Sequence, residues 1–380
     1  MKSKILLLYL NTGGGHLAPA RAVADSINKN FGDNTEAIPV DGFKETNKII
    51  KNICEDGYRY AQNNARFVWE LLYGLNKIDF FAKSTLNLIS KHTKKYIEKT
   101  VKEHNPEKII IFHAFLVKPV CEVIEKFNKK IKVFTLVTDP YSPAPMWFFN
   151  KETDYIISNE KLIENTDLKE IDKEKIHLLP FPLNEKFKSG SVLTQTKTKA
   201  ELGFDDNKPL ILIIGGADGI KKGKKIVREI LSKNVNIQIA VVCGKNKKLF
   251  KKLSKYKEKN KSENLTILGF INFVSDLLGI SDIIITKAGT STILEILVSG
   301  KVPLVCDYIW EQEKGNVDFV TEHKLGIYEK STAKIGKIIK QLSDNKDFAK
   351  GYNTNISKMN VENGSDQISK FIVEYPVSAN

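Results

Sequence analysis

The sequence predicts an α/β protein with two doubly wound parallel sheets, one in each half of its 380 residues. Short apolar runs of strand length alternate with segments of helical spacing, which is typical of parallel sheets covered by helices on both faces. This pattern stops in a stretch rich in Pro, Ser, Thr and Lys, residues 180–200, and then begins again. Such a composition indicates a linker. We therefore expect one domain over residues 1–183 and a second over residues 184–380.

The first half begins with a strand, a glycine loop and a helix. The apolar run 4–10 leads into the loop NTGGGH, residues 11–16, and the Ala and Val spacing that follows is helical. The loop has neither the lysine of a P-loop nor the GxGxxG spacing of a dinucleotide site, so it favours neither P-loop NTP hydrolysis nor a dehydrogenase. Further strands are expected at residues 36–42, 108–115, 132–140, 153–159 and 175–182.

Glycines follow several of the strands expected in the second half. These strands lie at residues 209–216, 236–244, 264–270, 282–289, 302–308 and 325–330. Gly215, Gly216, Gly244, Gly269 and Gly289 stand at or next to their carboxyl ends. Because these ends meet at the ligand crevice of an open parallel sheet, a ligand there would meet closely approaching backbone. The final helical stretch, residues 366–375, can return to the first domain.

The most informative stretch is residues 282–297, which predicts an anion site. Three isoleucines form a buried strand, Gly289 closes a tight turn, and the hydroxyls of residues 290–292 stand over the first turn of a helix. Helix N-terminal amides and hydroxyls bind phosphate. Glu295 either accepts hydrogen bonds from a ribose diol or completes a capping box. Gln312, Glu313 and Asn316 are the side-chain types that bind sugar hydroxyls, so together these residues predict a nucleotide-sugar.

Composition narrows the class of protein. The net charge of +14, with lysines dense around residues 221–225 and 245–261, favours an anionic partner or reflects a lysine-rich proteome. No nucleic-acid partner is expected, since no binding motif accompanies the charge. The four cysteines are far apart and predict neither a metal site nor disulfides, which fits the cytoplasm. We interpret the N-terminus as a strand, not a signal peptide, and the apolar runs are too short to span a bilayer.

Residues 43–104 interrupt the alternation with long helical patterns. Aromatic residues such as Phe67, Trp69 and Phe80 stand beside basic residues between Arg59 and Lys83. An amphipathic segment of this composition either lies on an anionic membrane surface or forms core.

The order of the motifs along the whole chain resembles a known group of enzymes. GGGH at residues 13–16, TD followed by Trp147, IIGGADG at residues 213–219, then GF, KAGTSTILE and QEKGN are similar to the glycosyltransferases that include monogalactosyldiacylglycerol synthase. The group also includes bacterial diacylglycerol glucosyltransferases and, more distantly, the peptidoglycan N-acetylglucosaminyltransferase. The resemblance implies a GT-B fold, with the acceptor held by the first domain and a UDP-sugar by the second. It also implies that the sugar is transferred with inversion of configuration and without a metal or a cofactor. The UDP-sugar is then a substrate.

The resemblance assigns roles to individual residues. Its donor-binding residues are Gly215, Gly216, Phe270, Ile271, Gly289, Thr290, Ser291, Thr292, Glu295, Gln312, Glu313 and Asn316; its acceptor-binding residues are Gly14, Gly15, His113 and Trp147; its catalytic residues are His16 and Asp139. An imidazole titrates near neutrality and can take the proton of an attacking hydroxyl. Asp139 either orients that ring or caps a turn, and His16 itself is either the base or a hydrogen-bonding residue at the helix start.

Three positions depart from the motifs of the lipid-galactosylating relatives. Ala144 stands where they have a His-Pro, Ala114 follows His113 in place of proline, and Glu311 replaces a glycine. These changes leave the sugar and the acceptor open. The leading expectation is transfer of a hexose from a UDP-sugar to a lipid, with diacylglycerol preferred, by a cytoplasmic protein bound peripherally to the membrane. The alternative is an enzyme of the same fold that uses UDP-N-acetylglucosamine, either a cell-wall precursor transferase or a 2-epimerase.

Overall fold

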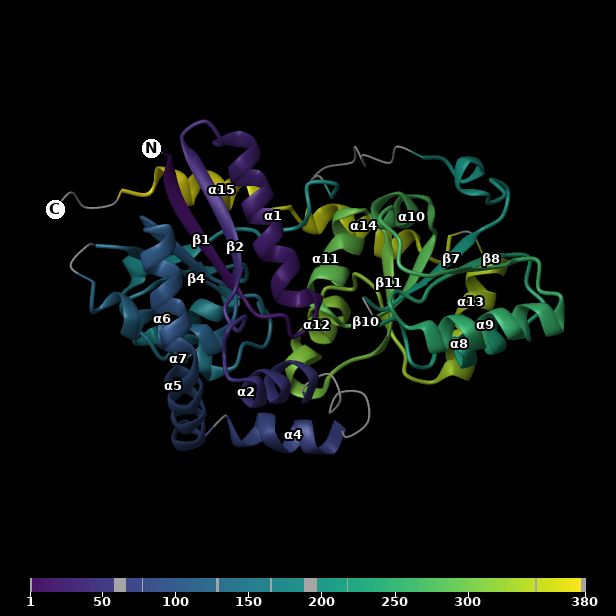
Figure 1. Cartoon of the computed structure of the whole chain (residues 1–380). Helices are drawn as coiled ribbons and strands as arrows, with labels where there is room; N and C mark the ends of the chain where they lie inside the picture. Colours follow the sequence, from purple (N-terminus) through teal and green to yellow (C-terminus); the bar gives the residue numbers. More distant parts are fainter. Residues whose placement is uncertain are drawn as a thin grey trace. The chain divides into compact units, whose positions relative to one another are not determined.

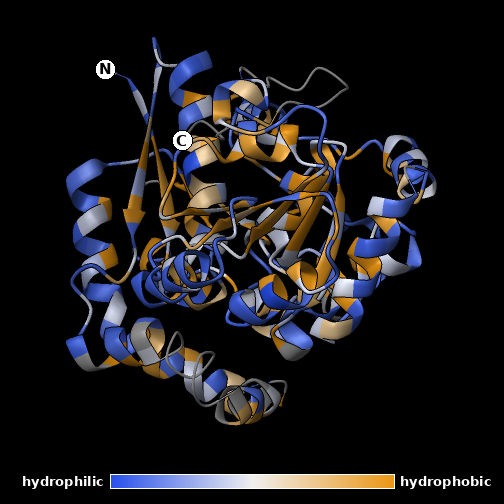
Figure 2. Ribbon diagram, turned by 90° about the vertical axis from the view of Figure 1, so that its right-hand side faces the viewer, coloured by the Kyte–Doolittle hydropathy of each residue, from blue (hydrophilic) through white to orange (hydrophobic). Residues whose placement is uncertain are grey.

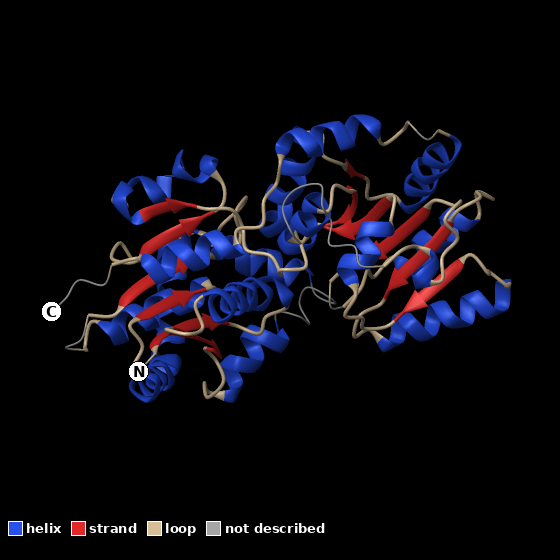
Figure 3. Ribbon diagram, turned by 90° about the horizontal axis from the view of Figure 1, so that it is seen from above, coloured by secondary structure: helices blue, strands red, loops and turns tan. Residues whose placement is uncertain are grey.

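The computed structural model describes residues 2–57, 66–76, 78–127, 130–164, 166–187, 197–216, 218–345 and 347–376. The chain forms two compact units (Figure 1). Unit 1 comprises Met1–Glu185, Trp310–Gln312 and Asn363–Asn380, and unit 2 comprises Lys186–Ile309 and Glu313–Glu362. Each contains a parallel six-stranded sheet between helices (Figure 3). The predicted α/β fold class, with two doubly wound sheets, is confirmed.

Unit 1 has the strand order β2-β1-β3-β4-β5-β6. The strands are β1 Ser3–Tyr9, β2 Thr35–Asp41, β3 Lys108–Ile111, β4 Lys132–Leu136, β5 Asp154–Ile157 and β6 Ile176–Leu178. The helices are α1 Gly14–Asn30, α2 Lys48–Asn52, α4 Arg66–Leu75, α5 Asp79–His104, α6 Ala114–Ile124, α7 Thr166–Lys169 and α15 Ser365–Glu374, with a π-helical turn at Ile53–Gly57. Leu8 of β1 pairs with Ile111 of β3, so the loops after these strands start side by side.

Unit 2 has the strand order β12-β11-β10-β7-β8-β9. The strands are β7 Leu210–Ile214, β8 Gln238–Val242, β9 Leu265–Leu268, β10 Ile283–Lys287, β11 Val302–Asp307 and β12 Ile327–Tyr328. The helices are α8 Gly223–Leu231, α9 Lys247–Asn260, α10 Val274–Ile280, α11 Thr290–Val298, α12 Trp310–Glu322, α13 Thr332–Asp344 and α14 Lys350–Met359. Strands β10 and β7 are neighbours, so the loops after them start side by side at the carboxyl edge of the sheet.

The central strands are mostly apolar because both faces of each sheet are covered, whereas the edge strand β2 has exposed residues. Every residue of β7 is buried, and Figure 2 shows the strands as the most hydrophobic elements. In β1 the side chains alternate between two cores: Leu6 and Leu8 pack with α5 and α6, whereas Ile5 and Leu7 pack with α1 and α15. Truncating one such side chain to alanine costs about 2–5 kcal/mol of folding free energy.

The last helix, α15, belongs to unit 1. Its first turn accepts a hydrogen bond at Asp366 from Ser26 of α1, 2.6 Å long. Its last turn accepts hydrogen bonds from the buried Lys108 amino group, at 2.6 Å to the carbonyl of Ile372 and 2.8 Å to that of Val373. A cation at this end is favoured by the helix dipole. The final helical stretch therefore returns to the first unit, and the two units divide between Glu185 and Lys186, close to the boundary predicted after residue 183.

The helical segment 43–104 is partly core and partly surface. Leu86, Ile97 and other residues of α5 are buried against α6. In contrast, Phe67 of α4 is 75% exposed and Phe80 of α5 is 72% exposed. Arg59 and Lys77 lie outside the described residues, as does the side chain of Trp69. Within the part of the chain that is described, no helix is both long and apolar enough to cross a bilayer.

Candidate active site

In unit 1 the candidate site begins at the glycine loop after β1. Gly13 caps α1 with φ of 137°, a conformation that favours glycine. Gly14 and Gly15 are exposed, and a Cβ on either would meet no atom within 4 Å. Packing therefore does not require glycine at these two positions, and the bare backbone at the start of α1 is open to a ligand.

The imidazole of His16 lies in the first turn of α1 and contacts two segments distant in sequence. Its Nδ1 is 2.7 Å from the hydroxyl oxygen of Thr138, which follows β4. Its ring centroid is 4.3 Å from that of His113. Burial lowers the pKa of His16, while the negative charge of Asp139 acts in the opposite direction. The ring is therefore neutral near pH 7 and able to accept a proton.

His113 caps the N-terminus of α6 with its side chain. Its Nδ1 accepts a hydrogen bond, 3.1 Å long, from the backbone N–H of Phe115, which in the neutral ring leaves the hydrogen on Nε2. Burial lowers the pKa of His113 well below its usual value, and the nearby His16 lowers it further. The site thus contains a second neutral imidazole, whose Nε2–H can donate a hydrogen bond.

Thr138, not Asp139, makes the hydrogen bond to His16. The carboxylate of Asp139 instead accepts a hydrogen bond from the indole N–H of Trp147, 3.1 Å long. Burial raises the pKa of Asp139, while the charge of His16 and this hydrogen bond lower it. Trp147 is only 1% exposed, so its ring lies in the core. Its indole N–H therefore holds the carboxylate of Asp139 in a fixed position. These five residues, His16, His113, Thr138, Asp139 and Trp147, form what we call the imidazole cluster.

In unit 2 the candidate site is the turn between β10 and α11. Gly289 precedes the first turn of α11, and no side chain of the described residues caps this helix. The hydroxyl of Ser291 is buried and has no hydrogen-bond partner in the described part of the chain. Buried polar groups are rarely left in this state. The α11 turn, residues 289–292, therefore has amides and a hydroxyl available for an anion.

The helix α12 holds the α11 turn in place. The side-chain amide of Asn316 donates to the carbonyl of Ala288 at 2.7 Å and to the hydroxyl of Thr290 at 3.1 Å. Asn316 is only 3% exposed, so it fixes the backbone and leaves its amide oxygen for other contacts. Glu313 accepts from the backbone N–H of Ile309, 2.7 Å away. Gln312 lies in the first turn of α12, within the short stretch that groups with unit 1.

The remaining predicted donor residues follow β7 and β9 or lie on α11. A Cβ on Gly215 would come within 2.6 Å of the Gly219 carbonyl oxygen, and Gly216 has φ of 69°, so both positions favour glycine. The ring of Phe270 is 71% exposed, beside the half-buried Ile271. Burial raises the pKa of Glu295, one turn after Thr292, to about 8. Among the described residues, no group of three or more His, Cys, Asp or Glu is placed to hold a metal.

The two halves of the chain match two protein families. Residues 16–183 match the monogalactosyldiacylglycerol synthase family, and residues 210–370 match the glycosyltransferase family 28 C-terminal domain. The chain is a glycosyltransferase. It is 28% identical to monogalactosyldiacylglycerol synthase 3 of Arabidopsis thaliana over 93% of its own length and 77% of that protein. It is 26% identical to the processive diacylglycerol beta-glucosyltransferase of Bacillus pumilus, over 98% of its own length and 94% of that protein.

Solved structures confirm the GT-B fold of this glycosyltransferase. The MurG structure from Acinetobacter baumannii has a TM-score of 0.58 at 13% identity, covering 98% of this chain and 99% of that one. UGT71G1 of Medicago truncatula, complexed with UDP-glucose, has a TM-score of 0.59 at 16% identity, covering 98% and 97%. The predicted GT-B architecture is thus confirmed.

Proposed function

We propose that this glycosyltransferase moves a hexose from a UDP-sugar to a diacylglycerol-type lipid at the membrane surface. The observation that carries the donor half is the α11 turn, where the uncapped helix start and the unpartnered hydroxyl of Ser291 suit a diphosphate. The acceptor class rests on the relatives, which are named as monogalactosyldiacylglycerol synthases and a diacylglycerol glucosyltransferase.

Different donor residues contact different parts of the UDP-sugar. The exposed ring of Phe270 stacks on the uracil beside Ile271, and the α11 turn binds the diphosphate. Glu295 accepts the ribose hydroxyls, and Glu313 with Gln312 and the free amide oxygen of Asn316 contacts the sugar. A carboxyl with a pKa raised by burial is well suited to this role, since two donated hydrogen bonds stabilise its ionised form.

His16 is the general base of the transfer. The acceptor hydroxyl gives its proton to the imidazole while its oxygen bonds to the anomeric carbon, and the bond from that carbon to the diphosphate oxygen breaks. The attack occurs opposite the leaving group, so the configuration inverts. In this proposal the tautomer of His16 donates from Nδ1–H to Thr138, 2.7 Å away, and takes the proton on Nε2. The Nε2–H of His113 then donates to the acceptor oxygen. The helix dipole and the hydroxyls of the α11 turn stabilise the UDP that leaves, in place of a metal.

The surface around α4 and α5 binds the cytoplasmic face of the membrane. Phe67, Leu71, Ile78, Phe80 and Phe81 are all exposed, and Lys83 stands beside them. Aromatic and aliphatic side chains enter the interface, and lysines contact anionic headgroups. This association makes the lipid acceptor accessible to the protein.

A donor screen tests the proposed function. The purified protein is incubated with UDP-glucose, UDP-galactose or UDP-N-acetylglucosamine and with vesicles that contain diacylglycerol and phosphatidylglycerol, and glycolipid is measured. We expect a hexosyl diacylglycerol from UDP-glucose or UDP-galactose. Turnover with UDP-N-acetylglucosamine alone would favour the cell-wall or epimerase alternative, and no product from any UDP-sugar would contradict the proposal.

A further inference from the structure

A hollow in unit 2, separate from the α11 turn, lies between the N-terminal halves of α8 and α9. These two helices run side by side (Figure 1). Its volume is about 500 Å³, within the range of small-molecule sites. None of the residues assigned to the donor lines it. Its cationic side chains, which with Asn246 and Leu249 define the basic hollow, are Lys221, Lys224, Lys225, Arg228, Lys248 and Lys252.

The basic hollow is held together by contacts within the fold. The side chain of Asn246 donates to the carbonyl of Asp218, 3.1 Å away in the loop after β7. The same side chain accepts from the backbone N–H of Leu249 at 2.9 Å and so caps α9. Leu249 is buried, and a Cβ on Gly223 of α8 would lie 3.7 Å from it. The two helix starts are therefore fixed relative to each other.

Two of the lysines lie in the first turns of α8 and α9, where a positive charge destabilises a helix. A helix N-terminus is the positive end of the dipole and favours carboxylates. Neither α8 nor α9 has an acidic residue in its first turn, and in the described part of the chain no side chain caps α8. Lys224 and Lys248 occupy these first turns instead. Residues that break a local rule of stability are often retained for a ligand.

Two lysines on α13 of unit 2 are paired with carboxylates. Lys334 is 3.8 Å from Glu329, and Lys340 is 2.9 Å from Asp344. In the basic hollow, Arg228 is 3.4 Å from Glu229, but no carboxylate of the described residues lines the hollow itself.

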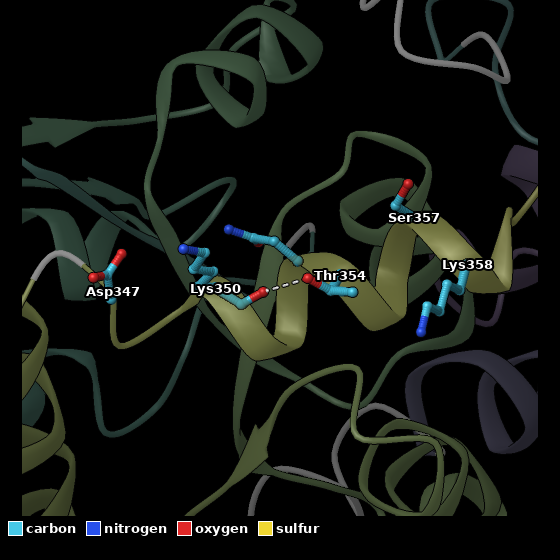
Figure 4. Close-up of a pocket in the computed structure, with 6 residues that line it drawn as sticks. Asp347, Lys350, Thr354, Ser357 and Lys358 are labelled. Atoms are coloured by element: carbon cyan, nitrogen blue, oxygen red, sulfur yellow. Dashed lines mark hydrogen bonds between the residues drawn. The ribbon is translucent and has the colours of Figure 1, made fainter.

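The other hollow of unit 2, on α14, is mixed in charge. Its volume is about 660 Å³, and Asp347 lines it together with Lys350 and Lys358 (Figure 4). The hydroxyl of Thr354 is already used, since it donates to the Lys350 carbonyl at 3.0 Å. The hollow on α14 thus has a carboxylate among its cations, whereas the lining of the basic hollow has none.

We propose that the basic hollow binds a ligand with two or more neighbouring phosphate groups, at a site separate from the nucleotide site. Lysine ammonium groups act as point charges toward phosphate, and the Arg228 guanidinium can donate two hydrogen bonds to one phosphate. The uncapped amides at the start of α8 add further donors. The phosphates belong either to a soluble polyphosphate or to phospholipid headgroups.

Calorimetric titration of the full chain with tripolyphosphate tests this site. The variant Lys224→Gln/Lys248→Gln removes two of the cations, and we expect its affinity to fall by about 10- to 30-fold. The matched control Lys334→Gln/Lys340→Gln removes the same charge from α13 and should bind as the wild type does. The first variant should melt no lower than the wild type, because the lost cations oppose the helix dipoles.

Two outcomes would overturn the proposal. An equal loss of affinity in the control variant would show that the lower net charge of the protein causes the effect. Displacement of tripolyphosphate by saturating UDP would show that tripolyphosphate binds in the nucleotide site. Competition with vesicles then identifies the source. Phosphatidylglycerol vesicles that displace tripolyphosphate, where phosphatidylcholine vesicles do not, assign the site to headgroups; failure of both to displace it assigns the site to a soluble polyphosphate.

Discussion

The imidazole cluster of unit 1 and the α11 turn of unit 2 both follow parallel strands, yet they are built in opposite ways. In the imidazole cluster the polar groups are paired within the protein: His16 with Thr138, and Asp139 with Trp147. In the α11 turn the hydroxyl of Ser291 is buried without a partner among the described residues, and the helix start is uncapped. One site is complete before a substrate binds, and the other is not.

This difference follows from what each site has to do. A general base must be oriented before the acceptor binds, because a misplaced group loses much of its catalytic effect. A site for a charged ligand must instead keep donors available, although a buried donor without a partner costs about 1–3 kcal/mol until the ligand binds. Substitutions at the prepared base should therefore lower turnover, and substitutions at the open binding turn should lower the affinity for UDP.

The largest effect is expected at the base. His16→Ala should lower turnover by about 10²- to 10⁴-fold, the usual contribution of general-base catalysis. The measurement is glycolipid formation at saturating donor and acceptor. Phe250→Ala, at an exposed position of α9, is a control that should keep the turnover of the wild type. Wild-type turnover in His16→Ala would require another base.

A smaller effect is expected at the ribose. Glu295→Ala should weaken UDP binding by about 1.5–3 kcal/mol, the range for hydrogen bonds to a charged group. Calorimetric titration with UDP measures this change in affinity. Glu322→Ala on α12 is the matched control, because it also removes one carboxylate. An unchanged affinity in a folded Glu295→Ala protein would remove this residue from the donor site.

The affinity for UDP should also rise with pH. Burial raises the pKa of Glu295 to about 8, so the free protein carries mostly the protonated carboxyl at pH 7. Ribose hydroxyls favour the ionised form, and binding is therefore stronger above this pKa, by about tenfold between pH 7 and pH 9. Titrations at several pH values measure the slope. Glu295→Gln should abolish it, and the same slope in that variant would assign the effect to another group.

The smallest effects on turnover and on UDP affinity are expected at the hydroxyls of Thr138 and Ser291. Thr138→Val should lower turnover by about 2- to 13-fold without changing UDP affinity, the equivalent of one neutral hydrogen bond. Ser291→Ala should weaken UDP binding by a similar factor. It should leave the melting temperature unchanged or slightly higher, because its hydroxyl has no partner to lose. Thr138→Ser should restore turnover, and the reverse assignment of the two effects would contradict the distinction.

The local geometry of the proposed donor site was predictable from the sequence, because the residues that form it are close together in the chain. The strand before the α11 turn is apolar throughout, and the glycine and three hydroxyls follow within a few residues. The same holds for Gly215 and Gly216 after β7. Local patterns of this kind report backbone geometry directly, since they reflect turn and helix-start preferences.

Contacts between distant side chains were not predictable. The hydrogen bond between His16 and Thr138 spans 122 residues and was not expected. For the neighbouring Asp139 the sequence left two roles open, orienting the ring or capping a turn. Trp147 is buried, and the side-chain amide of Asn316 donates to the carbonyl of Ala288. Neither environment was expected from the sequence, and the roles of these residues at the acceptor and at the sugar stay predictions. Neighbours such as Thr138 and Asp139 can both hydrogen-bond an imidazole, and only the three-dimensional packing decides which one does.

The most direct test of the account is the dissociation constant of UDP for His16→Ala, measured by calorimetry beside the wild type. Because the base belongs to unit 1 and the nucleotide contacts to unit 2, we expect the two constants to agree within about twofold while turnover of the variant falls by about a hundredfold or more. A loss of UDP affinity comparable to that of Glu295→Ala would contradict the account, since it would make His16 part of the nucleotide site.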